Sequence, residues 1–505
     1  MSTEDFLLAG STVRDVRRSI LCGELSATGL VEAYVDRIER YDQSGPEINA
    51  IVSVNPRAAD RASTLDQRLA DSGLVGPLHG VPVLIKDQFL TTEMPTTFGS
   101  KSFANFVPRE RAEIVQRLRD AGAIVLAKTN LPDWALGFTG HSTIVGQTKN
   151  PYSTEYDSGG SSAGTAAGLA AGFGVIGIGS DTGGSVRVPS AFCNLFGLRT
   201  TTGLLSTDGM SPLVASQDAP GPIARSVRDL AVTLDVIAGP LSNTSDSTHR
   251  SRSYTAALDS DGLDGTTVGI FRPAFGDSKR RRERSVNSVC ERAISKMADV
   301  GAEVIDPVTF PGLSTRLSET SLVELESRWR INGFLTRLEG SPYESVSALY
   351  GEGEFPCIPT GIETLSDAPT TPTRDPSYWR RVAAQRTFRE ELVGLLSSKE
   401  LDVLAFPTVQ RGPDRHASFD SDTSPTYPVN TPIAAHSSCP ALSVPAGFTT
   451  EGLPVGLELL AEPFAERQLV RIGSAYEHSV TQYSSPGKIP FDVRVYPEVS
   501  TAGTA

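Results

Sequence analysis

The chain of 505 residues is long enough for two or three average domains or for one large α/β domain with a substantial core. Its formal net charge of -13 argues against a polyanionic partner, so nucleic-acid binding is not expected. Five scattered cysteines, with no C-x-x-C pair, exclude a disulfide framework and a zinc site and suit a reducing, cytoplasmic compartment.

The N-terminal segment carries charges where a signal peptide needs an apolar run, so secretion is not expected. Residues 12–41 and 55–71 place apolar side chains at helical spacing, for example at Leu30, Tyr34 and Ile38. This spacing predicts amphipathic helices.

Strand and helix patterns alternate after this N-terminal region. The stretch "HGVPVLIKD" predicts a strand that ends at Lys86, and a helix over 110–122 and the strand "AIVLAKTN" follow. Further on, a strand at 267–271, a helix over 283–299 and a last helix over 464–478 are predicted. The last strands are predicted in "LDVLAFPT", "ALSVPAGF" and "LPVGLELLA".

This alternation favours one α/β domain over the whole chain, 1–505: an α/β/α sandwich with a mixed, mostly parallel sheet covered by helices. Residues 310–380 differ, because short helices surround a loop rich in proline and threonine. We interpret them as an insertion near the binding surface. Three parts of the domain are expected: N-terminal helices at about 12–71, a catalytic core at about 75–240 and the divergent insertion at about 310–380.

Residues 158–180 are uncharged over 23 positions, a length that can span a bilayer. They contain eight glycines and only five large apolar residues, which is too weakly hydrophobic and too flexible for a spanning helix. No membrane segment is predicted.

Two adjacent serines, Ser161 and Ser162, lie in the glycine- and alanine-rich stretch 156–172. The stretch matches the G-x-S-x-G nucleophile elbow, which requires a strand running directly into Ser162. The preceding residues are polar and turn-like, and no downstream histidine stands out as the base, so the elbow is disfavoured. Either serine is placed to cap a helix of small residues that runs to about Phe173.

A second glycine-rich turn, "GIGSDTGGSVRVPSA", follows a predicted strand. Such a turn can direct successive backbone N–H groups into one concavity, as a tetrahedral oxyanion requires, and Ser185 directly follows two glycines. Lys86 is the best candidate for the base, provided that burial lowers its pKa from about 10.4 toward neutrality. Thr182 stands where a dinucleotide fingerprint needs glycine, and no phosphate loop occurs. No cofactor is implied.

Together these segments resemble the amidase signature family. The block from 159 to 190 ends in the characteristic "DTGGSVRVPS", and "LHGVPVLIKDQF", "FCNLFGLRTTTGLLS" and "LSVPAGFTTEGLPVGLELLA" follow the order and spacing of the family. The resemblance covers roughly 15–480 and becomes weaker over 310–375.

The resemblance implies a Ser–cis-Ser–Lys mechanism, in which Ser185 is the nucleophile and Lys86 takes its proton through Ser161. Ser161 would follow a cis non-proline peptide bond. No metal is implied. The other implied site residues are the oxyanion-hole amides of Thr182, Gly183, Gly184 and Ser185, the hydrogen-bonding support Ser162, and the supporting pair Asp181 and Arg187.

The chain departs from the pattern of the family at a few positions. Ala163 stands where glycine is usual, Ser158 replaces proline or threonine, and His436 and Cys439 replace asparagine and Gly-Leu. None of these changes removes a catalytic group. We interpret His436 and Cys193 as packing or pocket-wall residues.

The resulting expectation is a cytoplasmic amidase that cleaves a linear carboxamide through a serine acyl-enzyme, with esters or carbamates as further candidate substrates. Its partner is a small-molecule amide, with a homo-oligomer left open. One alternative is the glutaminase subunit of a tRNA-dependent amidotransferase, which requires partner subunits. Another is a catalytically inactive binding scaffold, which the intact set of Lys86, Ser161 and Ser185 disfavours. Specificity is expected to lie in 310–380 and in the loop 134–139.

Overall fold

The computed structural model describes residues 8–239, 253–258, 262–351, 365–416 and 427–480. One sheet of eleven strands runs through this part of the chain, in the order β1-β3-β2-β8-β10-β9-β14-β15-β13-β11-β12. The strands are β1 (Ile51–Val54), β2 (Pro82–Lys86), β3 (Ile124–Thr129), β8 (Ile176–Asp181), β9 (Phe196–Arg199), β10 (Ala219–Ala224), β11 (Thr267–Phe271), β12 (Glu303–Val308), β13 (Val403–Pro407), β14 (Ala441–Phe448) and β15 (Pro454–Leu460). Two short hairpins lie outside it, β4 (His141–Ser142) with β5 (Gly146–Gln147), and β6 (Lys149–Asn150) with β7 (Ser153–Asp157).

The sheet is mixed, as expected, but the expectation of mostly parallel pairing is wrong. Strand β2 runs parallel to β3 and β8, and β11 runs parallel to β12 and β13. The other six neighbouring pairs, including the whole central run from β8 to β13, are antiparallel. For β14 and β15 the reason is the length of the connection, because the short turn 449–453 permits only an antiparallel pair.

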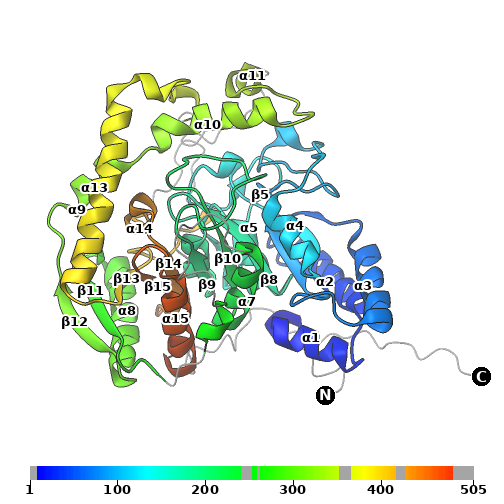
Figure 1. Cartoon of the computed structure of the whole chain (residues 1–505), viewed down its shortest axis with the longest axis horizontal. Coiled ribbons are helices and arrows are strands. Elements are labelled where there is room, and N and C mark those ends of the chain that lie inside the picture. The colour runs from blue at the N-terminus through cyan, green and yellow to red at the C-terminus, as the bar shows by residue number, and fades with distance from the viewer. Residues whose placement is uncertain (1–7, 240–252, 259–261, 352–364, 417–426, 481–505) are drawn as a thin grey trace, which may run out of the picture.

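Helices pack along the sheet and cover it (Figure 1). The helices are α1 (Val13–Leu21), α2 (Ala27–Tyr41), α3 (Ala58–Ser72), α4 (Glu113–Asp120), α5 (Ala163–Ala170), α6 (Arg187–Phe192), α7 (Val227–Ala238), α8 (Arg281–Asp299), α9 (Leu313–Thr320), α10 (Val323–Arg337), α11 (Val346–Gly351), α13 (Pro376–Ser398), α14 (Pro432–Ser437) and α15 (Glu466–Val480).

The helix predicted over 12–41 is two helices, α1 and α2. Thr12 forms a capping box with Asp15 at the start of α1, and Ser26 accepts a hydrogen bond from the Gly29 N–H at the start of α2. Between them Gly23 adopts a left-handed φ of 68°, which ends α1. Hydrophobic spacing alone does not show this break, because both helices turn an apolar face toward the same core.

The segment 310–380 folds as the expected short helices, α9 to α11 and the first turn of α13. Figure 1 shows α10 and α11 together at one end of the molecule and α13 running from that end toward β11 and β12. The ring of Phe334 in α10 meets Phe98 edge-on, with 5.7 Å between centroids, and Phe98 stacks on Trp134 at 4.8 Å. The insertion thus packs against Phe98, which in turn stacks on Trp134 of the loop 134–139. Part of the insertion, 352–364, lies outside the described residues.

Small residues let α5 lie directly against the sheet. Its residues are alanine, glycine, threonine and one leucine, and all of them are buried. A Cβ on Gly164 would collide with the backbone carbonyl of Ala50 and the backbone nitrogen of Asn130. The uncharged stretch 158–180 is therefore a core segment, and none of the described helices has the length and apolar character to cross a membrane.

We predict that Gly164→Ala lowers the free energy of unfolding by about 1–3 kcal/mol, because neither backbone neighbour can move away cheaply. The matched control is Gly394→Ala, at an exposed glycine of α13 with open space around it. That change should raise the free energy of unfolding by up to about 1 kcal/mol, since alanine favours the helix. Urea unfolding of both variants tests the pair, and equal effects would contradict the close packing of α5.

Candidate active site

Lys86 ends the buried strand β2, and its ammonium group lies inside the protein. Its Nζ donates hydrogen bonds to Ser161 Oγ at 2.7 Å and to Ser180 Oγ at 2.8 Å. Burial lowers the pKa of Lys86 to about 7, against the opposing attraction of Asp181 and Asp218. A large fraction of this amine is therefore neutral near pH 7 and able to accept a proton.

Ser161 follows Gly160 through a cis peptide bond and is completely buried. Gly160 is needed at this point because a Cβ there would collide with the carbonyl oxygen of Thr139. The cis bond and the contact with Lys86 are both features that the family resemblance implies. The structure thus brings Lys86 and Ser161 together as expected.

Ser162 precedes the first residue of α5, but its hydroxyl does not cap the helix. It donates to the Ser180 carbonyl and accepts from the Ser180 N–H, both at 3.3 Å. The capping expectation is therefore wrong, and α5 ends at Ala170 rather than near Phe173. The hydroxyl instead ties the start of α5 to the end of β8, as suits a supporting residue.

Ser185 lies in the loop 182–186, between β8 and α6, and is 5% exposed. Its carbonyl accepts a hydrogen bond from the Ser162 N–H at 3.0 Å, which holds the two serine segments side by side. Within the described residues, its hydroxyl makes no hydrogen bond, and none forms between the hydroxyls of Ser161 and Ser185.

The four amides predicted for the oxyanion hole are in the same loop. Among the residues that the structure describes, no acceptor is bonded to the backbone N–H groups of Thr182, Gly183, Gly184 or Ser185. Gly184 has a φ of 141°, a conformation that favours glycine. These donors are thus free to bind a ligand oxygen.

Asp181 and Arg187, the two expected supporting residues, form a buried ion cluster below this loop. The Asp181 carboxylate accepts from Arg187 at 2.9 and 3.0 Å, from Arg199 at 3.0 Å and from the Val186 N–H at 3.1 Å. Burial favours the neutral acid, but the two guanidinium groups outweigh it and hold the pKa of Asp181 below its ordinary value. Arg187 also pairs with Glu458 of β15, whose own pKa burial raises to about 7.

Sequence reasoning missed two polar residues that contact Lys86 directly or through one partner. Ser180 accepts from Lys86 and donates to Gln88 Oε1 at 2.5 Å, and the Gln88 amide donates to the Ser211 carbonyl at 2.6 Å. A usable signal was present, because Ser180 ends an apolar strand beside "DTGGS" and Gln88 lies two residues after Lys86.

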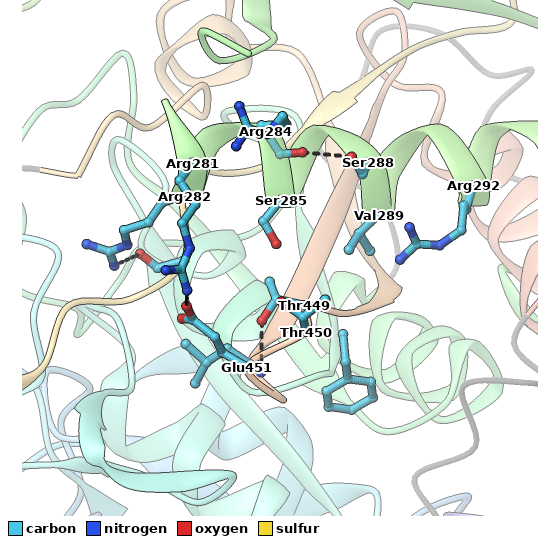
Figure 2. A pocket seen from close by; sticks show the side chains of 13 residues that line it. Arg281, Arg282, Arg284, Ser285, Ser288, Val289, Arg292, Thr449, Thr450 and Glu451 are labelled. Atoms are coloured by element: carbon cyan, nitrogen blue, oxygen red, sulfur yellow. Dashed lines mark hydrogen bonds and ion pairs between the residues drawn. The ribbon is translucent and has the colours of Figure 1, made fainter. Parts of the chain in front are cut away.

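A groove of about 390 Å³ lies elsewhere, between α8 and the β14–β15 turn, and Figure 2 shows arginines along its α8 side. It contains none of the candidate site residues. Arg281 pairs with Glu451 and Arg282 with Asp414, so the basic run at 279–282 is partly neutralised by acidic neighbours. The described residues hold no cluster of three or more histidine, cysteine or acidic side chains suited to a metal ion.

Comparison with known proteins assigns the chain to a family. The family model described as Amidase matches residues 29–470. The chain belongs to the amidase family. It is accordingly an amide-hydrolysing enzyme.

Relatives within the amidase family include amidotransferase subunits and a peptide amidase. A glutamyl-tRNA(Gln) amidotransferase subunit of Clostridium acetobutylicum is 32% identical over 486 residues, with 92% of this chain and 98% of the relative covered. The peptide amidase of Stenotrophomonas maltophilia is 33% identical with a TM-score of 0.82, covering 93% of this chain and 97% of that one. The corresponding glutamyl-tRNA(Gln) amidotransferase subunit of Thermotoga maritima is 27% identical, with a TM-score of 0.73 and coverage of 94% and 95%.

The lowered pKa of Lys86 leads to a prediction for the pH dependence of this amidase. Because a base must be neutral to accept a proton, amide hydrolysis should be lost as the pH falls through about 7. A profile of kcat/KM between pH 5 and 9 measures this acid limb.

The control is Glu458→Gln, because Glu458 also has a pKa of about 7. The acid limb should persist in this variant and should be absent, together with most activity, in Lys86→Ala. A limb that disappears in Glu458→Gln, or wild-type rates in Lys86→Ala, would assign the titration to another group.

Proposed function

We propose that this amidase cleaves the C–N bond of a linear carboxamide through an acyl-enzyme on Ser185. The observation that carries the proposal is the contact of 2.7 Å between the buried Lys86 amine and the Ser161 hydroxyl. Next to it lies a loop with a serine and four amides that bond to no acceptor in the described part of the chain. A neutral amine, a hydroxyl and a second hydroxyl in neighbouring segments are the parts of a proton relay.

In the first half of the reaction, Ser185 Oγ attacks the carboxamide carbon while its proton passes to Ser161, whose own proton passes to Lys86. The carbonyl oxygen becomes an oxyanion, and the N–H groups of residues 182–185 are available to stabilise it. The tetrahedral intermediate then breaks its C–N bond, and the proton held by Lys86 returns through Ser161 to the leaving nitrogen. Ammonia or an amine departs and the acyl group stays on Ser185.

In the second half, a water molecule replaces the amine. Its proton passes along the same two residues to Lys86, its oxygen attacks the acyl carbon, and Ser185 recovers its proton as the carboxylic acid leaves. Esters and carbamates share the acyl carbon and the developing oxyanion, so the same groups are suited to them as well.

The serine roles predict different outcomes for two variants. Ser185→Ala should abolish turnover, because it removes the attacking oxygen. Ser161→Ala keeps that oxygen but breaks the proton path, so kcat/KM should fall by about 10²–10⁴-fold. Steady-state kinetics on purified variants with unchanged melting temperatures gives the comparison.

The position of the covalent adduct separates the relay from the nucleophile-elbow alternative. A slow ester substrate or a fluorophosphonate should label Ser185, as located by peptide mass spectrometry. An adduct on Ser161 or Ser162 would overturn the mechanism.

A second candidate function is the glutaminase of a tRNA-dependent amidotransferase, which the relatives named as glutamyl-tRNA(Gln) amidotransferase subunits favour. We expect the isolated chain to release ammonia or amine from aliphatic, aryl or peptide amides faster than from glutamine. A panel of such amides, assayed without any added protein, tests this expectation. Selective glutamine hydrolysis would favour the glutaminase instead.

A further inference from the structure

Successive backbone carbonyl groups at the end of β8 and in the loop that follows each accept a hydrogen bond. The donors to the first two of these carbonyls are side chains. The Asp181 carbonyl accepts a hydrogen bond from Arg199 Nη1 at 2.5 Å. The Thr182 carbonyl accepts one from Gln217 Nε2 at 3.0 Å. Both donors belong to buried side chains that lie outside the loop.

The next two carbonyls are held in the same way. Thr431 Oγ1 donates to the Gly183 carbonyl at 2.6 Å, and the backbone N–H of Val188 donates to the Gly184 carbonyl at 2.8 Å. Thr431 is itself anchored, because its own carbonyl accepts from Arg187 at 2.9 Å. Four successive carbonyls, 181 to 184, therefore each have a fixed partner.

These bonds determine where the free amides point. In a trans peptide the N–H lies opposite the C=O, so a peptide whose carbonyl is held on one side directs its N–H to the other. Among the described residues, cis bonds precede only Ser161 and Pro307, so the loop peptides are trans. Each bonded carbonyl therefore fixes the direction of the following N–H. These N–H groups are the amides 182 to 185, which have no acceptor among the residues that the structure describes.

We propose that Thr431 and Gln217 are positioning residues for the oxyanion hole. Gln217 holds the peptide that carries the Gly183 N–H, and Thr431 holds the peptide that carries the Gly184 N–H. Glycine at both positions leaves the loop free to rotate, so a bond from outside is what fixes it. The inference rests on the proposed attack by Ser185, and it gives the two side chains a role that they exert through the loop carbonyls.

The hydrogen bonds that hold the loop continue through Gln217 to α13, the helix that follows the divergent insertion. The amide of Gln385, in α13, donates to Gln217 Oε1 at 3.0 Å and to the carbonyl of Thr320, at the end of α9, at 2.8 Å. Gln217 is thereby oriented with its NH₂ toward Thr182. The segment where the family resemblance is weakest is thus connected to the oxyanion hole by two side chains.

The test removes the Thr431 hydroxyl while keeping the shape of the side chain. Thr431→Val should lower kcat and kcat/KM together by about 10- to 100-fold, because loss of a whole oxyanion donor costs about 10²–10³-fold and here a donor is only misdirected. KM should stay nearly unchanged. The affinity for a substrate-derived boronic acid, which forms a tetrahedral adduct on the nucleophile, should fall by the same factor as kcat.

Three further variants separate positioning from a purely structural effect. Thr431→Ser keeps the hydroxyl and should restore most of the activity. Thr233→Val removes a comparable buried hydroxyl that bonds to a carbonyl inside α7, far from the loop in the chain, and should leave activity unchanged. Gln217→Met removes the hydrogen bond to the Thr182 carbonyl and should reproduce the loss of activity. This variant keeps the test decisive if Thr431→Val does not fold. The acid limb of the pH profile should not move in any of them.

Two negative results can be told apart. A boronate adduct on Ser185 with wild-type kinetics in both Thr431→Val and Gln217→Met overturns the positioning role and leaves the proposed function intact. An adduct on any other residue overturns the proposed function, and the positioning role with it. Mass spectrometry of the same samples makes the distinction.

Discussion

The buried carboxylate of Asp181 is the charge around which the candidate site is built. It ends β8, faces two guanidinium groups and accepts the Val186 N–H, so the chain must turn back over it within five residues. That turn contains the glycines and Ser185. An unpaired carboxylate at this depth is very costly, so Arg187 and Arg199 make this conformation of the loop stable rather than merely possible. The same negative charge favours the protonated form of Lys86, and burial of the amine outweighs it.

The antiparallel centre of the sheet explains how distant segments reach this loop. Strand β10 pairs with β8 and β9, so residues just before β10, such as Gln217 and Asp218, lie beside the end of β8. Strand β15 returns antiparallel to β14 and brings Glu458 to Arg187. A sheet of purely parallel strands would need a crossover helix for each of these approaches.

Much of this architecture could be predicted from the sequence, and the failures have physical causes. Buried strands such as β2 and β8 appear in the sequence as apolar runs. Lys86, Ser161 and Ser185 each lie in a short sequence motif, so these site residues could be predicted. Strand direction was not, because an apolar run is the same in both directions. Thr431, Gln217 and Gln385 are ordinary polar residues in three separate segments, and only the folded topology shows that two of them bond to the loop 182–186.

The pairing of Arg187 with Glu458 also bears on how the protein is made. The two residues are separated by 271 positions, so a chain emerging from the ribosome carries the glycine–serine loop long before its last partner exists. Until Thr431 has been synthesised, the loop lacks the donor to its Gly183 carbonyl, and until β15 has followed, Arg187 lacks one of its two carboxylates. The candidate site is therefore completed only once β15 has been synthesised, and a chain cut short before that point holds Ser185 without these partners.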